Sequence, residues 1–404
     1  MRVLYTSPII EHPPAGGPQL RVVNSIKALS RVSDLHVVSR VRRGNLGGPA
    51  GEEFLRRTAA GFGYAPSAHP LRSNSLMRAA RARLPLLART ETMRDARALV
   101  GKIDRLGADV LWFGYGNISF ELMRAVRAAR PDLKLVCDTD SVWSRFVLRE
   151  LPYVTDATRR REIEILGREK ELEERDWTDF CDVTTGVSEV DVEYYRSIAR
   201  EPRKVHQFSN VLDLSNYREI KGADPTSRPV LYLAGTFGHA DSPMDVGARW
   251  IVDEVLPLVR REIPDAHLFI VGIRSDLTLG HLQGPSITVT GKVPSVLPYL
   301  AEASVSLVPL RFESGTRFKI LEAAACGVPV VSTTLGAEGL PVRDGEHLLI
   351  ADSPEDFARS IVSLIRDRTL ARRISASSRA LVEHGFSLVR LESEARTILD
   401  FLEC

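Results

Sequence analysis

The chain has 404 residues, a formal net charge of +2, and a composition of 44% hydrophobic and 26% charged residues. This length predicts two domains, each large enough to bury its own core, and the composition is that of a globular protein. No apolar run reaches the roughly 18 residues of a membrane-spanning helix, the four cysteines form no C-x-x-C pair, and the nine histidines show no metal-ligand spacing. These features argue against a transmembrane protein, a disulfide scaffold and a structural metal site, and we expect a cytoplasmic protein without a bound metal.

Short apolar runs alternate with helical segments along both halves of the chain, which is typical of parallel α/β sheets. In the first half the predicted strands are residues 2–6, 34–39, 109–113, 134–137, 183–186 and 204–207. In the second half they are residues 230–234, 267–271, 287–290, 305–309, 328–332 and 347–350. A loop-like stretch over 210–228 separates the halves. We therefore expect two Rossmann-like domains, residues 1–210 and 211–385. Residues 386–404 are predicted to form a C-terminal helix, which could cross back to the first domain.

The first predicted strand is followed by a long loop, SPIIEHPPAGGPQLR, and then by a helix predicted over residues 20–30. Gly16 and Gly17 in this loop permit close approach of the backbone to a ligand, although a Gly-Gly pair is also common in ordinary turns. The loop has no G-x-G-x-x-G pattern, which argues against an NAD-dependent oxidoreductase. We take Gly17 as a candidate ligand-binding residue.

Residues 40–97 are strongly basic, with twelve arginines, no lysine and four acidic residues. Such a segment suits contact with an anionic membrane, a lipid-linked acceptor or an acidic acceptor, and equally suits solvated arginine-rich helices. We expect no nucleic-acid partner, because only Phe54, Phe62 and Tyr64 could stack on bases. A second charged segment, residues 155–179, is predicted to be a supporting helix.

Two carboxylates follow the predicted strand at 134–137. Asp138 and Asp140 stand at positions i and i+2, a spacing that suits Mg²⁺ or Mn²⁺ but also arises by chance. We interpret both as residues at the carboxyl end of a strand, where they would contact an acceptor or assist proton transfer.

The run RFESGTRFKILEAAACGVPVV, residues 311–331, combines a glycine turn, a helix predicted over 316–326 and a buried strand. Free backbone N–H groups at the helix start, with Arg317 and Lys319 in the predicted first turn, would form an anion site. Glu322 lies one turn further along the same face as Lys319. As a carboxylate it could accept hydrogen bonds from two vicinal hydroxyls of a ribose, or it could be a solvated residue paired with Lys319.

This run, the following GVPVVSTTLGAEGL and the later PVRDGEHLLIADSPEDFARSIVSLIRD resemble the donor-binding half of a large family of retaining glycosyltransferases. The family is often called family 4, or glycosyl transferases group 1, and the resemblance covers most of residues 228–390. It implies the GT-B fold, in which two Rossmann-like domains face each other across a cleft. Its E-x7-E motif holds the nucleotide ribose with the second Glu, the place that Glu322 occupies. The first place is Ser314, with Glu313 beside it, in a GTRxKxLEA variant of the motif.

The resemblance also implies roles for single residues. Gly17 would lie beside the donor diphosphate, Asp138 or Asp140 would stand near the place where relatives carry a histidine, and no metal would be needed. The loop that begins at Gly235 and Thr236 lacks the Arg and Lys that relatives often place there. The remaining donor-site residues would contact the nucleobase through their backbone (Lys292 and Val293), the sugar hydroxyls (Glu313 and Ser314), the phosphates (Gly315, Thr316, Arg317 and Lys319) and the ribose (Glu322).

The resemblance therefore predicts a retaining glycosyltransferase that moves a sugar from a nucleoside-diphosphate sugar to a hydroxyl acceptor, without a cofactor. The acceptor would be a polysaccharide, a lipid-carrier glycan or a small molecule. A non-catalytic nucleotide-sugar-binding protein and a GT-B-type sugar-nucleotide epimerase stay open as alternatives, since Ser314 replaces Glu and the loop lysine is missing.

Overall fold

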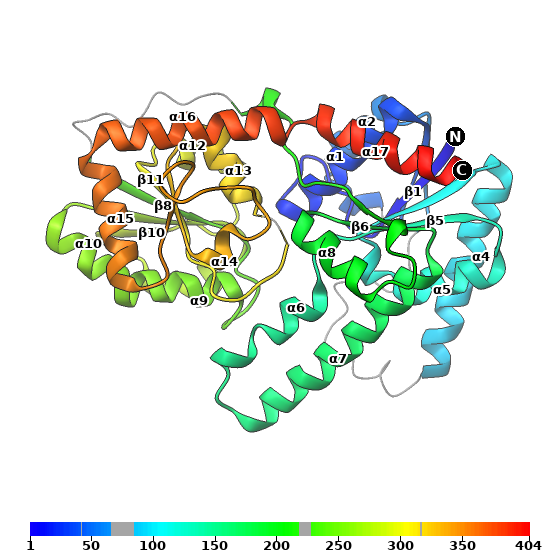
Figure 1. The fold of residues 1–404 in the computed structure, drawn as a ribbon, viewed down its shortest axis with the longest axis horizontal. Helices are drawn as coiled ribbons and strands as arrows, with labels where there is room; N and C mark the ends of the chain where they lie inside the picture. Colours follow the sequence, from blue (N-terminus) through cyan, green and yellow to red (C-terminus); the bar gives the residue numbers. More distant parts are fainter. Residues whose placement is uncertain (42, 66–84, 218–227, 316) are drawn as a thin grey trace. The chain divides into compact units, whose positions relative to one another are not determined.

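The structure is a computed structural model that describes residues 1–41, 43–65, 85–217, 228–315 and 317–404 (Figure 1). The chain forms two compact units. The first consists of Met1–Asn210 together with Leu388–Cys404, and the second of Val211–Ser387. Parts of the basic segment 40–97 and of the stretch 210–228, namely residues 42, 66–84 and 218–227, lie outside the described residues.

The first unit is built on a seven-stranded parallel sheet in the order β3-β2-β1-β4-β5-β6-β7. Its central strands are near-continuous apolar runs, because helices cover both faces of a parallel sheet. The strands are β1 (Arg2–Ser7), β2 (Asp34–Ser39), β3 (Gly61–Tyr64), β4 (Val110–Gly114), β5 (Lys134–Asp138), β6 (Val183–Gly186) and β7 (Val205–Gln207). The helices are α1 (Gly17–Val32), α2 (Pro49–Thr58), α4 (Pro85–Leu106), α5 (Phe120–Ala129), α6 (Trp143–Leu148), α7 (Ala157–Phe180), α8 (Glu189–Ile198) and α17 (Leu388–Glu403).

Helix α17 packs along α1, so the last helix of the chain is part of the first unit. Glu394 of α17 accepts hydrogen bonds from the backbone N–H of Ser209 at 2.7 Å and from its hydroxyl at 2.8 Å. Arg31 of α1 forms an ion pair with Glu392. Figure 1 shows α6 and α7 extending beyond the sheet of this unit. The buried Glu174 of α7 ties this pair together by accepting hydrogen bonds from Ser144 of α6.

Two sequence predictions for this unit need correction. The sheet has seven strands and not six, because β3 was missed; its GFGY sequence is only half-buried and contains two glycines, which weaken the strand signal. Helix α1 begins at Gly17 and not at residue 20, since Pro18 in the first turn has a backbone φ that suits a helix start.

The second unit contains a six-stranded parallel sheet in the order β10-β9-β8-β11-β12-β13, the number of strands predicted. Several strands are shorter than predicted, most of all at 328–332 and 347–350. The strands are β8 (Val230–Ala234), β9 (His267–Val271), β10 (Ile287–Val289), β11 (Val305–Val308), β12 (Val330–Ser332) and β13 (Leu349–Ile350). The helices are α9 (Pro243–Trp250), a π-helical turn (Ile251–Val255), α10 (Leu256–Glu262), α11 (Ser275–Leu279), α12 (Leu297–Ala301), α13 (Phe318–Ala325), α14 (Thr334–Ala337), α15 (Pro354–Arg366) and α16 (Arg368–Gly385).

Both sheets are fully parallel among the described strands, so each has one edge at which all strands end. Ligands of such sheets bind outside the carboxyl ends of the strands. The predicted site residues lie on this edge in each unit, after β5 in the first and after β8, β10 and β11 in the second. The fold class predicted from the sequence, α/β with two parallel sheets, is confirmed.

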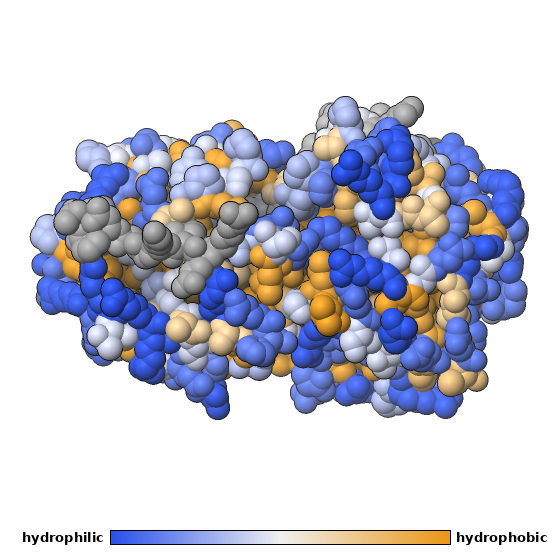
Figure 2. All heavy atoms as spheres, turned by 90° about the horizontal axis from the view of Figure 1, so that it is seen from above, coloured by the Kyte–Doolittle hydropathy of each residue, from blue (hydrophilic) through white to orange (hydrophobic). Residues whose placement is uncertain are grey.

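The surface carries the mixture of side chains seen on most globular proteins. Figure 2 shows hydrophilic residues over much of one face, with apolar residues interspersed among them. Within the described ranges, no helix combines the length and the hydrophobicity needed to cross a membrane.

Candidate functional site

The turn between β11 and α13 is built on a backbone that requires glycine. Gly315 has a φ of +84°, in the left-handed region, where a side chain would strain the chain. Its neighbour Thr316, a predicted phosphate contact, lies outside the described residues. Arg317 has extended dihedral angles and precedes the helix, so α13 begins at Phe318, two residues later than predicted. The prediction that Arg317 lies in the first helical turn is therefore wrong, whereas Lys319 does lie there.

The Arg317 side chain folds back onto its own turn. Its Nη1 donates to the carbonyl oxygen of Ser314 at 2.7 Å and to that of Gly315, and its Nε lies 3.7 Å from the Glu313 carboxylate. The residue is only 4% exposed. Its Nη2 has no hydrogen-bond partner within the part of the chain that the structure describes. Arg317 thus stabilises the turn, while its Nε and Nη2 make no hydrogen bond to the described residues, a state that an anion would relieve.

Lys319 is a poorly solvated cation at the start of α13. Its Nζ donates to the Met244 sulfur of α9 at 2.7 Å, and a thioether is a weak acceptor. The pKa of Lys319 is lowered to about 8, mainly by burial and in part by the charge of Arg317, against the opposing effect of Glu313 and Glu322. A bound anion would favour the charged ammonium and reverse this shift.

Glu322 lies on the second turn of α13. Its Oε1 accepts a hydrogen bond of 2.8 Å from the hydroxyl of Tyr217, and burial raises the pKa of the carboxyl, opposed by Tyr217 and Lys319. The far end of the same helix is held by Arg379 of α16, whose Nη1 donates to the carbonyl oxygen of Ala325 at 2.6 Å. The short helix is therefore held at Glu322 and at its C-terminal end.

The loops after β8, β9 and β10 meet through their glycine backbones. A side chain at Gly272 would come within 2.0 Å of the Gly235 carbonyl oxygen, and the Gly272 N–H donates to the Gly291 carbonyl at 3.1 Å. Met244 connects this group to α13, because a side chain at Gly235 would meet the Met244 methyl group at 2.9 Å while the sulfur contacts Lys319. The structure thus brings the loop of Gly235 beside Lys319.

The other predicted residues of these loops are accessible. Thr236 and Lys292 are exposed, and Val293 is half-buried. Lys292 and Val293 follow Gly291 directly, so they share the edge formed by the three loops. The sequence did not predict Gly272 or Met244 as members of this group, since neither carries a recognisable motif.

In the first unit, Asp138 is buried in a network that the sequence did not reveal. Asp138 is 1% exposed and forms an ion pair with Arg21 of α1, which is itself 3% exposed. Arg21 also donates to Asn210 Oδ1 at 2.9 Å and to the Phe208 carbonyl at 3.0 Å, and the Thr185 hydroxyl donates to Asp138 at 3.0 Å. The only sequence signal for Arg21 was a cation near the start of a predicted helix. Gly17, the predicted ligand contact, is the first residue of this helix and lies one turn before Arg21.

Asp140 is the more accessible of the two predicted carboxylates. It is half-buried, and it accepts hydrogen bonds from the Asn117 amide and from the Trp143 indole N–H at 3.3 Å. Burial raises the pKa of its carboxyl, opposed by hydrogen bonds from Tyr115 and Asn117. Tyr115, directly after β4, has a φ of 63°, a left-handed conformation that non-glycine residues adopt mainly at turns and functional sites. Asp140 is therefore more accessible than Asp138, which is engaged by Arg21.

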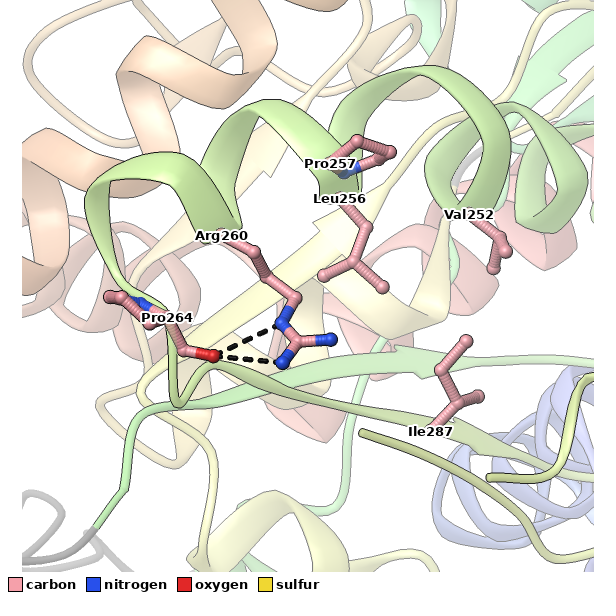
Figure 3. A pocket seen from close by; sticks show the side chains of 6 residues that line it. All are labelled: Val252, Leu256, Pro257, Arg260, Pro264 and Ile287. Atoms are coloured by element: carbon pink, nitrogen blue, oxygen red, sulfur yellow. Dashed lines mark hydrogen bonds between the residues drawn. The ribbon is translucent and has the colours of Figure 1, made fainter. Parts of the chain in front are cut away.

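A hollow on the second unit lies elsewhere on its sheet. Figure 3 shows the six side chains that line it, Val252, Leu256, Pro257, Arg260, Pro264 and Ile287. Arg260 is occupied there, because its Nε and Nη2 both donate to the Pro264 carbonyl oxygen, at 3.1 and 2.9 Å. Pro264 precedes β9 and Ile287 begins β10, so the hollow lies at the amino ends of the strands, opposite to the predicted site. We also find no group of three or more metal-ligating side chains among the residues described.

Residues 228–367 match the family model of the glycosyl transferases group 1. This match lies within the second unit and shows that this part of the chain is similar to that family. Among curated proteins, the phosphatidyl-myo-inositol mannosyltransferase of Mycobacterium leprae is 30% identical over 188 residues, 45% of this chain and 49% of that protein. The D-inositol 3-phosphate glycosyltransferase of Paenarthrobacter aurescens is 30% identical over 164 residues, 37% of this chain and 38% of that protein. The chain thus matches half or less of the length of these relatives.

Solved structures resemble the chain over its full length. The Anabaena protein HepE, solved in complex with UDP and glucose, has a TM-score of 0.65 and 12% identity, with 99% of each chain covered. The sucrose-phosphate synthase of Thermosynechococcus elongatus has a TM-score of 0.72 and 16% identity, covering 100% of this chain and 99% of its own. At such identities the similarity establishes the GT-B fold.

Proposed function

We propose that the chain is a glycosyltransferase that takes a sugar from a nucleoside-diphosphate sugar, with the donor bound at the carboxyl edge of the sheet of the second unit. The observation that carries this proposal is the start of α13. Arg317 and Lys319 are two poorly satisfied cations there, and Glu322 follows one turn later. Two cations suit a diphosphate, and a carboxylate one turn away suits the hydroxyls of a ribose.

The chemistry follows from the charge that develops on the donor. When the bond between the anomeric carbon and the diphosphate breaks, negative charge grows on the leaving phosphate and positive charge on the sugar. Cationic donors that already point at the phosphate stabilise this transition state more than the ground state. We assign Gly315, Thr316, Arg317 and Lys319 to the phosphates, and Glu313 and Ser314 to hydroxyls of the sugar.

The acceptor hydroxyl gains a bond to the anomeric carbon and loses its proton. We propose transfer with retention, in which a phosphate oxygen of the leaving group takes that proton on the same face of the sugar. Asp140, with its raised pKa, is the second candidate for the proton, and its hydrogen bonds to Asn117 and Trp143 would orient it. Asp138 stays a predicted catalytic residue, although its carboxylate forms an ion pair with Arg21.

The names of the relatives support this class of donor and acceptor. HepE is solved with UDP and glucose, and two of the curated relatives are named as transferases with inositol-containing acceptors. We therefore rank a UDP-sugar first among the possible donors. A lipid-linked acceptor and a small polyol are proposed as acceptors in addition to a growing polysaccharide. Contact of residues 40–97 with an anionic membrane is part of the same proposal.

A thermal-shift panel of UDP-, GDP-, dTDP- and ADP-sugars tests the donor assignment. A ligand at a hundred times its Kd is expected to stabilise the protein by about 2.7 kcal/mol, and we expect one base to do so and the others to do less. The donor identified in this way is then incubated alone and with acceptors, and the products are analysed. Absence of stabilisation by every member of the panel would contradict the assignment.

Two other functions are favoured by the same departures from the family motif, Ser314 in the place of Glu and a β8 loop without lysine. A non-catalytic binding protein would be stabilised by the donor without forming any product. An epimerase of this fold would convert the donor when no acceptor is present. The product analysis of donor alone and of donor with acceptor separates all three.

A further inference from the structure

Helix α7 carries exposed apolar side chains on the face that points away from its own unit. The opposite face is buried against that unit through Ile163 and Trp177. On the outer face, Ile165 is 52% exposed and Leu172 is 62% exposed. These two residues are seven positions apart, as are Thr158 and Ile165, and seven residues are close to two helical turns. The three side chains therefore form one line along the outside of the helix.

Exposed apolar residues are concentrated on the α6–α7 hairpin. Among the described residues, the large apolar side chains that stay exposed are Met93, Tyr153, Ile165, Leu166, Leu172, Leu277 and Val389. Four of these seven, Tyr153, Ile165, Leu166 and Leu172, lie on α7 or on its connection to α6. The hairpin extends beyond the sheet in Figure 1. Single exposed apolar residues are ordinary, whereas a group of them on a projecting element is typical of an interaction surface.

The line of Thr158, Ile165 and Leu172 runs between two flanks of opposite charge. Each flank repeats every seven residues, so it follows the line along the whole helix. All six charged residues of the two flanks are exposed. The basic flank consists of Arg161, Arg168 and Arg175, and the acidic flank of Glu162, Glu169 and Asp176.

The charges of these flanks are poorly neutralised within the chain. Glu169 and Asp176 have no basic residue three or four positions away on α7, and both are at such a distance from Glu173, which is also acidic. Arg168 and Glu169 form no ion pair with any residue that the structure describes, and neither do Arg161 and Asp176. A partner with the complementary pattern of charges would neutralise both flanks.

A second copy of α7 has that complementary pattern when the two helices run in parallel. About a two-fold axis along the apolar line, the left flank of one parallel helix meets the right flank of the other, so arginines face carboxylates. An antiparallel pair would bring like flanks together. An anionic membrane suits the face less well, because its acidic residues equal its arginines in number.

We propose that α7 is a homodimerisation surface, on which two copies of the chain pair in parallel through Ile165 and Leu172. The arginine flank of each copy faces the acidic flank of the other, which sets the direction of pairing. This surface lies apart from the proposed donor site on the second unit, so the inference does not depend on the proposed function.

Sedimentation velocity of the full chain over a range of micromolar concentrations tests the apolar contact. We expect a monomer–dimer equilibrium for the natural protein. Leu172→Glu places two carboxylates opposite each other across the two-fold axis, and the dissociation constant of the dimer is expected to rise at least about tenfold. Leu277→Glu on α11 is the matched control, because Leu277 is 70% exposed and lies outside the hairpin, and it should dimerise as the natural protein does. Both positions are already in water, so both variants should keep the natural melting temperature.

Exchange of charges tests the direction of pairing. Arg168→Glu and Glu169→Arg each place like charges face to face in a parallel pair, and each is expected to weaken dimerisation about fivefold. The double variant exchanges the signs on both sides of the line. It should restore the natural dissociation constant to within about twofold, since opposite charges meet again.

Three results of these experiments would overturn the inference: a natural protein that stays monomeric, a dimer that Leu172→Glu leaves intact, or stronger association of Arg168→Glu. The last is the result expected of an antiparallel pair. A membrane partner would show itself as binding to vesicles of phosphatidylserine and phosphatidylcholine that Leu172→Glu abolishes while the protein is monomeric, and this too would overturn the inference.

Discussion

Replacing Arg21 by methionine is expected to destabilise the protein by about 3–5 kcal/mol, the cost of leaving a buried charge without its partner. Asp138 would remain 1% exposed after the loss of Arg21, its one cationic partner among the described residues. The carbonyl of Phe208 and the side-chain oxygen of Asn210 would lose a donor as well. Denaturant unfolding followed by circular dichroism measures this change in the free energy of unfolding.

Two further variants separate the buried pair from a general effect of losing arginine. Arg31→Met removes another arginine of α1, which is 57% exposed and pairs with Glu392, and a cost below about 1 kcal/mol is expected. The double variant Arg21→Met with Asp138→Leu removes both charges and should regain a large part of the stability. A loss in Arg21→Met no greater than that in Arg31→Met would show that the network contributes little.

Lys319→Met is expected to lower kcat/KM for the donor about 30-fold, since a charge-assisted contact contributes about 2 kcal/mol. Methionine has a similar length and suits the contact with Met244, so packing is retained while the charge is lost. The exposed Lys292 gives a matched control. Lys292→Met should stay within a few-fold of the natural protein, because the predicted contact there is made by backbone. Equal kcat/KM values for Lys319→Met and Lys292→Met would contradict the role of Lys319.

The pH dependence of donor binding gives a second measure of the same residue. The pKa of Lys319 is lowered to about 8, so the ammonium is charged below that pH and loses its charge as the pH rises through it. We therefore expect the affinity for a nucleoside diphosphate to decline above about pH 8 in the natural protein, and this decline to be absent in Lys319→Met. The bound anion raises the pKa, which shifts the decline toward higher pH in the complex.

The fold could be predicted because the strands of both sheets are covered on both faces. Such strands are nearly continuous apolar runs, as in Val230–Ala234, and they can be located without knowing their neighbours. β3 was missed because its two glycines and half-buried residues lack that signal. The start of α13 was placed too early, because helix propensity does not show that Arg317 keeps an extended backbone to reach the carbonyls of Ser314 and Gly315.

The sequence was enough to propose which types of residue form the candidate site. It did not show which residues from distant parts of the chain contact them. The turn and helix at 314–322 are local, so Lys319 and Glu322 could be proposed as site residues from their spacing together with the family resemblance. Tyr217 meets Glu322, and Arg21 meets Asp138, across more than a hundred residues each, and no periodicity connects such pairs. Asp138 and Asp140 looked equivalent in the sequence, yet only the structure shows that Arg21 engages the first and leaves the second more accessible.

The central claim is that a nucleoside-diphosphate sugar binds where β8 and β11 end, against the start of α13. Hydrogen–deuterium exchange with and without the donor selected by the thermal-shift panel tests this most directly. We expect slower exchange in peptides that cover residues 235–237 and 313–322, and no change in those that cover 252–264 beside the hollow of Figure 3. Protection confined to 252–264, or stabilisation without any protection at 313–322, would contradict this account.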